Sequence, residues 1–236
     1  MKTFLSILIL LISAIPDGWS QANPAIAVLP QGPPPMPIFV EDITGRPLSS
    51  KLLDDIEGSP FLLPDWNWGA VKFKNGKYAK DIALKFNVYN NQLFFKRGEE
   101  AFEFVLPVSE FMIGYQKEGD SVAVLYRNGF PDTERTNGST FFELLTDGKF
   151  QLLKYRFKEL RSFKPYNQAE RKQFADNEQL YVYAGGSITK IKKDKESVMR
   201  ALSQYAEEIR VIVEREKLKL KSETDLVKLF SELNKK

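Results

Sequence analysis

The sequence contains neither histidine nor cysteine, and this double absence excludes several kinds of site. Without imidazole or thiol there is no Ser-His-Asp triad, no Cys-His pair, no zinc site built from those ligands, no disulfide and no covalent c-type haem. Any chemistry has to come from carboxylates, lysine, tyrosine or serine. We therefore predict no cofactor, no metal site and no catalytic residue.

Long apolar runs are also missing beyond the first twenty residues, so no membrane span is expected, because a transmembrane helix requires roughly 20 apolar residues. The sequence has no glycine-rich phosphate loop and no EF-hand pattern. The acid pairs Asp54-Asp55, Glu99-Glu100 and Glu207-Glu208 are adjacent in sequence. Neighbouring side chains diverge on regular elements, so these pairs do not make an acid-base couple by themselves.

The composition is that of a globular protein, with 43% hydrophobic residues among 236 and a net charge of +3. From Ser187 to the end, thirteen Lys or Arg face nine Asp or Glu. Because the two signs are interleaved, this surplus indicates solvated helix surfaces. A nucleic-acid partner is not expected, since its footprint is a denser basic patch.

Residues 1 to 20 have the order of regions found in a cleavable signal peptide. A positive start at Met1-Lys2-Thr3 precedes an apolar stretch, 4 to 15, that is too short to span a bilayer, and Gly18-Trp19-Ser20 supplies small residues before Gln21. We predict cleavage after Ser20 and a secreted or periplasmic protein.

Residues 21 to 50 are rich in proline. Proline fixes φ and removes a backbone donor, which favours an extended, unpaired chain. The composition predicts a disordered lead-in that acts as a spacer and lies outside the core. A proline-rich ligand for an aromatic groove is the alternative.

The stretch from Gly69 to Leu106 is typical of an antiparallel meander. Apolar residues alternate with polar ones before and after Asn75-Gly76, a dipeptide that suits a two-residue hairpin turn. Further hairpins are predicted around 117 to 120, 146 to 148 and Gly185-Gly186. We interpret 162 to 177, which lacks either periodicity, as an exposed connector.

The C-terminal region has helical periodicity. Asp194 is a candidate N-cap for a helix reaching about Glu216, with apolar residues three and four positions apart. Ser222 begins a second capping pattern, followed by another apolar stripe. Both amphipathic helices should pack on the β domain as a helical hairpin.

Trp66 and Trp68 stand at the start of the meander, and they share a side if the backbone is extended. Such a pair can stack on a carbohydrate, so both are candidate ligand contacts. The alternative is that they seal the end of the β core.

The chain resembles a family of secreted proteins of unknown function from Bacteroidota. The resemblance lies in Gly58-Ser59-Pro60-Phe61-Leu62, in Asn75-Gly76-Lys77-Tyr78, in the stretch from Leu84 to Leu93, and in Tyr181-Val182-Tyr183 followed by Thr189 to Lys193 and the helices after them. An acidic pair of the family pattern is replaced here by Asn91-Gln92. The resemblance implies the fold and the export, and brings no activity or site residue with it.

The sequence thus predicts an α+β fold of four segments: a signal peptide (1–20), a lead-in (21–50), a mainly antiparallel β domain (51–193), barrel-like or a sandwich, and two C-terminal helices (194–236). The leading functional hypothesis is a non-catalytic binding module of the cell envelope, whose partner is a protein or an envelope glycan. The alternatives are a carboxylate-dependent glycan hydrolase and a structural subunit of a surface assembly. Neither the partner nor the oligomeric state follows from the sequence.

Overall fold

The structure is a computed structural model, and it describes residues 42–47, 56–117, 119–164, 166 and 169–235. The expected signal peptide and residues 21–41 and 48–50 of the proline-rich lead-in lie outside the described residues. The last described part of that lead-in belongs to the sheet, because Gly45–Pro47 forms a strand and Ile43 is 1% exposed in the core. The lead-in is therefore shorter than its composition predicts.

In the described part of the chain, twelve strands form one sheet. In chain order they are β1 (Gly45–Pro47), β2 (Ile56–Glu57), β3 (Asn67–Phe73), β4 (Tyr78–Asn87), β5 (Gln92–Arg97), β6 (Glu100–Phe104), β7 (Val108–Lys117), β8 (Asp120–Arg127), β9 (Phe142–Thr146), β10 (Phe150–Phe163), β11 (Arg171–Ala184) and β12 (Ser187–Ile191). Three α-helices follow, α1 (Lys195–Ala201), α2 (Ala206–Arg215) and α3 (Glu223–Leu233).

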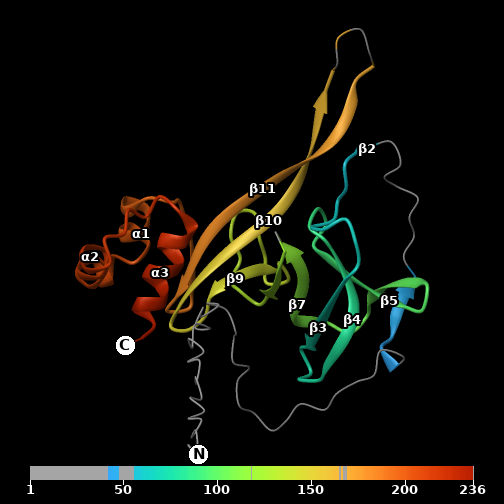
Figure 1. Cartoon of the computed structure of the whole chain (residues 1–236), viewed down its shortest axis with the longest axis horizontal. Coiled ribbons are helices and arrows are strands. Elements are labelled where there is room, and N and C mark those ends of the chain that lie inside the picture. Colours follow the sequence, from blue (N-terminus) through green and yellow to red (C-terminus); the bar gives the residue numbers. More distant parts are fainter. Residues whose placement is uncertain (1–41, 48–55, 118, 165, 167–168, 236) are drawn as a thin grey trace, which may run out of the picture.

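The sheet is open and almost entirely antiparallel. Its strand order is β1-β6-β5-β4-β3-β7-β8-β9-β10-β11-β12, and β2 adds a short parallel pairing to β11. The helices sit at one end of the sheet and β1 with β5 at the other (Figure 1). The predicted α+β class with C-terminal helices is confirmed. No helix within the described ranges is long and apolar enough to cross a bilayer.

The predicted hairpin turns fall where the sequence places them. At Asn75-Gly76 only Gly76 has a positive φ, 84°, and Phe73 and Lys77 close a three-residue loop instead of the expected two-residue turn. Gly185 and Gly186 both have positive φ, as a two-residue turn of mirror-image type requires. The turns thus follow from glycine placement, and their loop lengths depend on the strands around them.

The N-terminal half of the sheet curls around an aromatic core. Phe86 lies at the centre, with ring centroids 5.1 Å from Phe111, 5.4 Å from Tyr126 and 5.9 Å from Phe141. All four rings are buried. Period-two alternation places Phe86, Phe111 and Tyr126 on one face of β4, β7 and β8, and Phe141, just before β9, packs on the same face, which forms the first core.

The helices cover the same face of β10 to β12 and form the second core. Leu152, Leu180 and Val182 of the sheet pack with Ile209 and Phe230. The two expected N-caps are present, since Asp194 accepts a hydrogen bond from the Ser197 amide and Ser222 accepts one from the Asp225 amide. The helices therefore pack on the β domain, as predicted.

The first expected helix is interrupted. A 3-10 turn, Ser203–Tyr205, separates α1 from α2 after Leu202 leaves the helical region with φ −122° and ψ 44°. This break brings the Tyr205 ring edge-on to Phe150, 4.7 Å between centroids. The continuous apolar stripe predicted one helix, but packing against the sheet divides it into α1 and α2.

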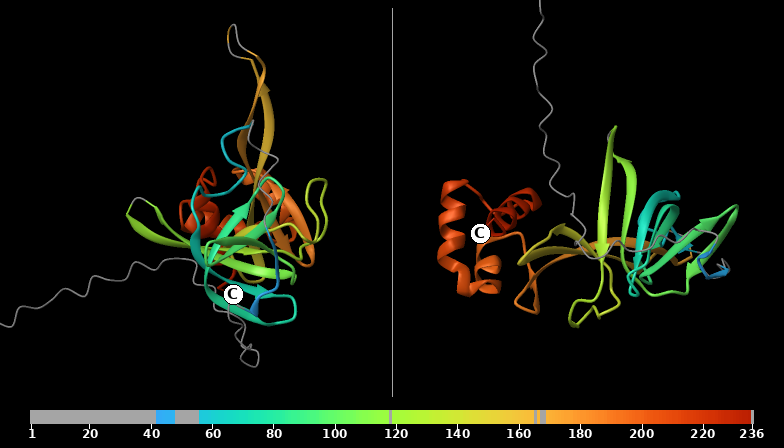
Figure 2. Two further views of the ribbon diagram at one scale, coloured as in Figure 1. Left: turned by 90° about the vertical axis from the view of Figure 1, so that its right-hand side faces the viewer. Right: turned by 90° about the horizontal axis from the view of Figure 1, so that it is seen from below.

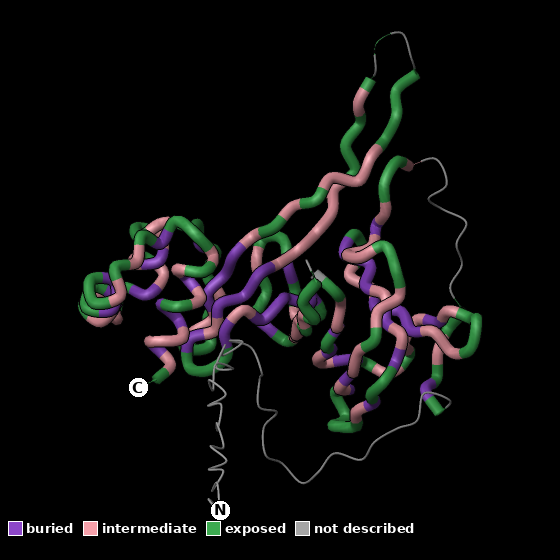
Figure 3. Tube along the Cα trace, in the orientation of Figure 1, coloured by how far each residue is buried: buried purple, intermediate pink, exposed green. Residues whose placement is uncertain are grey.

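The predicted connector at 162 to 177 is wrong over most of its length. β10 and β11 pair without interruption from Phe150↔Ala184 to Phe163↔Arg171 and project as a two-stranded arm (Figure 1). The distal part of the arm is largely exposed (Figure 3). Cross-strand pairs such as Lys158–Asp176, 3.2 Å apart, replace the apolar alternation on which the sequence reading depended.

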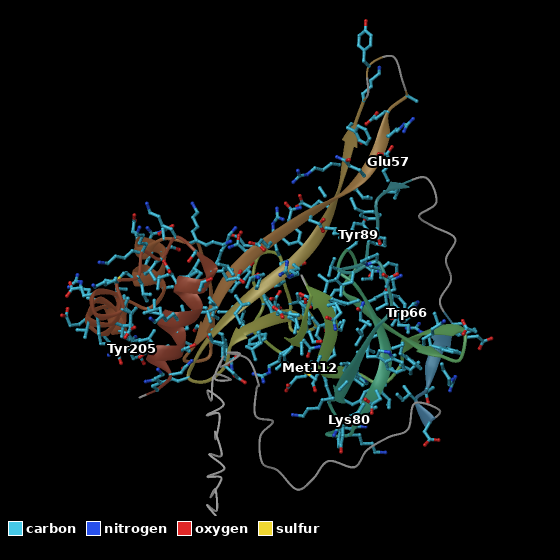
Figure 4. All side chains as sticks on the ribbon, viewed as in Figure 1. Glu57, Trp66, Lys80, Tyr89, Met112 and Tyr205 are labelled. Carbon is cyan, nitrogen blue, oxygen red and sulfur yellow. The ribbon has the colours of Figure 1, made fainter. Side chains whose placement is uncertain are left out.

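The β11 strand of the arm is held by contacts with the N-terminal half. Phe174 meets Tyr89 with ring centroids 5.2 Å apart, and Arg171 forms a 2.9 Å ion pair with Glu57 of β2. Tyr89 and Glu57 are labelled beside the arm in Figure 4. These contacts tie the two halves together at a second point, away from the main sheet.

Asn234 closes the C-terminal end of α3 onto the turn between β9 and β10. Its Oδ1 accepts from the Phe150 amide at 2.9 Å, while its Nδ2 donates to the carbonyls of Phe150 and Asp147 at 2.8 and 2.9 Å.

Asn234→Ala removes three hydrogen bonds, so we expect a loss of about 2 kcal/mol in the free energy of unfolding, measured by urea titration. Lys228→Ala, an exposed position on the same helix, should change it by less than about 1 kcal/mol. Equal effects of the two substitutions would contradict this role.

Candidate functional site

Trp68 is the most exposed tryptophan in the described chain. It lies in β3, opposite Ala83 of β4, with 67% of its surface exposed. It points away from the aromatic core, because Val71 and Phe73, on the core side of β3, are buried. An indole left in water on the outer face of a sheet contributes little to the core and is available to a ligand.

A hollow of about 300 Å³ adjoins this indole. Its lining combines apolar groups with three charged side chains: Trp68, Asp81, Ile82, Ala83, Lys96, Arg97 and Gly98. We call it the Trp68 hollow. Its volume is at the lower end of the range for ligand pockets, so it suits a group about the size of one sugar ring.

A β-bulge brings Asp81 to the hollow. Gly69 pairs with Ile82 and Val71 with Ala79, so two residues of β4, Lys80 and Asp81, oppose one residue of β3. Asp81 has a φ of 55°, which only a few per cent of non-glycine residues adopt. Bulges of this kind re-aim a side chain and are frequent beside binding sites.

Lys96 and Arg97 reach the hollow from the end of β5. Lys96 forms a 2.7 Å ion pair with Glu99, and the Arg97 guanidinium stacks 4.6 Å from the Phe102 ring centroid. Gly98 turns the chain directly after them with a φ of 60°. The hollow thus has an acceptor from β4 and donors from β5, flanking one aromatic face.

Trp66 does not line the Trp68 hollow. It is half-buried just before β3, and Lys85 holds its ammonium 5.8 Å from the indole and 4.6 Å from the Phe61 ring. Figure 4 labels Trp66 over the N-terminal part of the sheet. The structure therefore separates the two predicted contacts: Trp68 borders a hollow, while Trp66 belongs to a cation–π cluster with Lys85 and Phe61.

A second hollow, of about 400 Å³, lies between β12 and α1. Its polar groups already serve local structure. Asp194 caps α1, the Ser197 hydroxyl accepts from the Lys192 amide, and Arg200 pairs with Glu196. With no aromatic side chain in its lining, this hollow offers a ligand less than the Trp68 hollow does.

A cluster of charged side chains lies where the two cores meet. Glu143 of β9 is 7% exposed and Lys154 of β10 is 3% exposed. The Arg156 Nε lies 2.5 Å from Glu143, and the Lys154 Nζ lies 3.5 Å from Glu143 and 2.7 Å from Glu223. Glu178 adds a carboxylate 3.9 Å from Arg156. We call this set the junction cluster.

The electrostatics of the junction cluster are those of a structural ion network. Burial opposes ionisation of Glu178, but hydrogen bonding from Lys193 together with Lys154 and Arg156 lowers the pKa of its carboxyl below the usual range. Burial and the Glu143 charge raise the pKa of Tyr126 far above its usual range. A general acid for glycoside hydrolysis needs a raised carboxyl pKa, and Glu178 has the opposite.

Every described carboxyl group whose pKa departs from its ordinary range is shifted downward. Hydrogen bonds from Lys228 and Arg215 lower the pKa of Glu216 to about 2, and Lys96 lowers that of Glu99. Burial raises the pKa of Asp147, but the Arg127 guanidinium outweighs it and the net shift is downward. Within the described ranges no group of three or more acids can hold a metal ion.

Sequence reasoning named Trp68 but missed Asp81, Lys96 and Arg97. The pairing of β4 with β5 and the bulge in β4 bring them together, and neither leaves a local pattern in the chain. One signal was available: Gly98, a residue that suits a turn, directly follows Lys96 and Arg97, and a turn there places two cations at a strand end.

No protein-family profile, no curated protein and no solved structure matches this chain. The site therefore has to be interpreted from its own residues.

Proposed function

We propose that the chain is an exported, non-catalytic binding module of the cell envelope, and that it holds a glycan at the Trp68 hollow. The observation that carries this proposal is the exposed indole beside one carboxylate and two cations. An aromatic face stacks on the apolar face of a sugar ring, while Asp81 accepts from hydroxyl groups and Lys96 and Arg97 donate to them.

The charge arrangement supports binding over turnover. Asp81 is the acid that lines the hollow, and the other lining charges are cations. A glycosidase needs two carboxyl groups flanking the scissile bond, about 5 to 10 Å apart. The most buried acid, Glu143, is instead paired with Lys154 and Arg156 in the junction cluster. The hydrolase alternative therefore has no support at this site.

The test measures binding of the purified protein to insoluble peptidoglycan and to an array of neutral and acidic oligosaccharides. We expect Trp68→Ala to lower the affinity for the retained glycan at least tenfold, because central aromatic anchors dominate binding energy. Trp66→Ala is the matched control and should bind as the unaltered protein does. Asp81→Asn should weaken binding less than the loss of the indole.

Three outcomes would contradict the proposal: no glycan retained by the unaltered protein, equal binding by Trp68→Ala, or release of reducing ends from the array. The last of these would restore the hydrolase hypothesis. Thermal unfolding of each variant separates loss of the site from loss of the fold.

A further inference from the structure

We infer that the outer edge of β8 pairs with the same edge of a second copy of this chain. β8 pairs with β9 only at Tyr126↔Glu143 and Arg127↔Phe142. Among the described residues, no backbone hydrogen bond joins the outer edge from Ser121 to Leu125 to any other element. The β7–β8 hairpin projects from the body with this edge open, as Figure 2 shows in bright green.

The two terminal strands of the sheet, β1 and β12, are protected, whereas this stretch of β8 is not. β1 has three residues and ends at Pro47, and β12 carries Lys190 and leads directly into α1. Short strands, proline, lysine and covering helices are the devices that prevent edge pairing. The β8 edge reads Ser-Val-Ala-Val-Leu, with no charge, no proline and no bulge in its pairing with β7.

The position and length of the open stretch of β8 favour a second copy of this chain as its pairing partner. The β7–β8 turn ends the edge on one side, and β9 joins at Tyr126 on the other, so the open stretch is centred on Ala123. An antiparallel pairing about a two-fold axis at Ala123 uses the whole stretch and stops before β9. Such a closed, self-complementary contact is the commonest form of homodimer.

The side chains fit this pairing. Across the axis Val122 lies opposite Val124 of the second copy, and Ser121 lies opposite Leu125. Val122 and Val124 share their face of the hairpin with Tyr115 and Ile113, which pack against the first core. At the axis the smallest side chain, Ala123, meets itself with Gly114 beside it on β7. No like charges face each other over these five residues.

The proposed dimer contact would also shield apolar side chains on the outer face of the β7–β8 hairpin. Met112 pairs with Leu125 in the β7–β8 ladder and is 42% exposed. A second copy continues the sheet beside Leu125 and shields this apolar strip. Interfaces built on one short strand pair bury little area and belong to the weak class, so the dimer should dissociate on dilution.

The first test uses charge at the two-fold axis. We expect light scattering of the unaltered protein to show a dimer that grows with concentration, and Ala123→Lys and Ala123→Glu each to weaken it at least tenfold, because like charges then oppose each other. An equimolar mixture of the two variants should restore the dimer. Gln116→Lys, on the β7 side of the same hairpin, should dimerise normally.

The second test exploits the absence of cysteine from the sequence. Directly opposed residues in an antiparallel pair have Cα atoms about 4.5 or 5.5 Å apart, which a disulfide can bridge. Ala123→Cys should therefore form a covalent dimer under mild oxidation, and Gln116→Cys should not.

Two results would overturn the inference. The first is a protein that stays monomeric at about 1 mM, a concentration at which a dimer with a binding free energy of only about −4 kcal/mol would already be substantially populated. Equal cross-linking of the two cysteine variants would overturn it too. Neither result depends on the Trp68 hollow.

Discussion

Replacing Glu143 with leucine is expected to lower the free energy of unfolding by about 3 to 5 kcal/mol. Glu143 is the carboxylate that Lys154 and Arg156 share in the junction cluster. Removing one partner of a buried ion pair leaves the other charge uncompensated, and that cost greatly exceeds the net stabilisation the pair provides. After the change Lys154 keeps its ion pair with Glu223, but among the described carboxylates Arg156 keeps only Glu178, 3.9 Å away.

Chemical denaturation of the variant and of two controls measures this effect. Glu143→Leu with Arg156→Met removes the orphaned charge and should recover a large part of the loss. Glu207→Leu breaks an exposed ion pair with Arg210 and should cost less than about 1 kcal/mol. If Glu143→Leu behaves like Glu207→Leu, the junction cluster does not stabilise the fold.

Phe86→Ala is expected to cost a similar amount, about 3 to 5 kcal/mol, through a different mechanism. The ring of Phe86 touches the three other rings of the first core. Truncation leaves a cavity bounded by the rings of β7, β8 and the residue before β9, and these rings cannot close it without disturbing the strand pairing. For a chain of this size the melting temperature should fall by roughly 10 °C.

Tyr89→Ala is the matched control, because it follows the same strand and loses one ring contact, with Phe174. Its partly exposed ring should contribute about 1 kcal/mol. Differential scanning calorimetry of both variants makes the comparison. If the melting temperature of Phe86→Ala lies within about 2 °C of that of the unaltered protein, Phe86 is not a central residue of the first core.

The sequence predicts the class of fold well where side-chain polarity alternates or glycine fixes a turn. β4 and the Gly185-Gly186 turn follow directly from such patterns. The distal arm does not, because its two strands are held by cross-strand pairs of charged and polar residues. Lys158 and Asp176 carry no apolar alternation, so they read as a loop until their partner strand is known.

The candidate site, too, could be predicted only in part from the sequence. An exposed tryptophan near a strand start was predictable, but which of the two tryptophans borders a hollow depends on the register of β3 with β4. Trp68 lies beside the bulge at Asp81, and Trp66 lies over Lys85. Side-chain pairing across strands is a long-range property, and the local sequence does not contain it.

The strand order also implies a sequence of events during folding. From β9 to β12 every strand pairs with the next one along the chain, whereas β3 has to find β7 and β1 has to find β6. Closing a long loop costs more entropy than closing a short one, so sequence-local hairpins assemble early. Hairpins of consecutive strands should therefore form first, and the pairings of β3 with β7 and of β1 with β6 should close later because they join more distant parts of the chain.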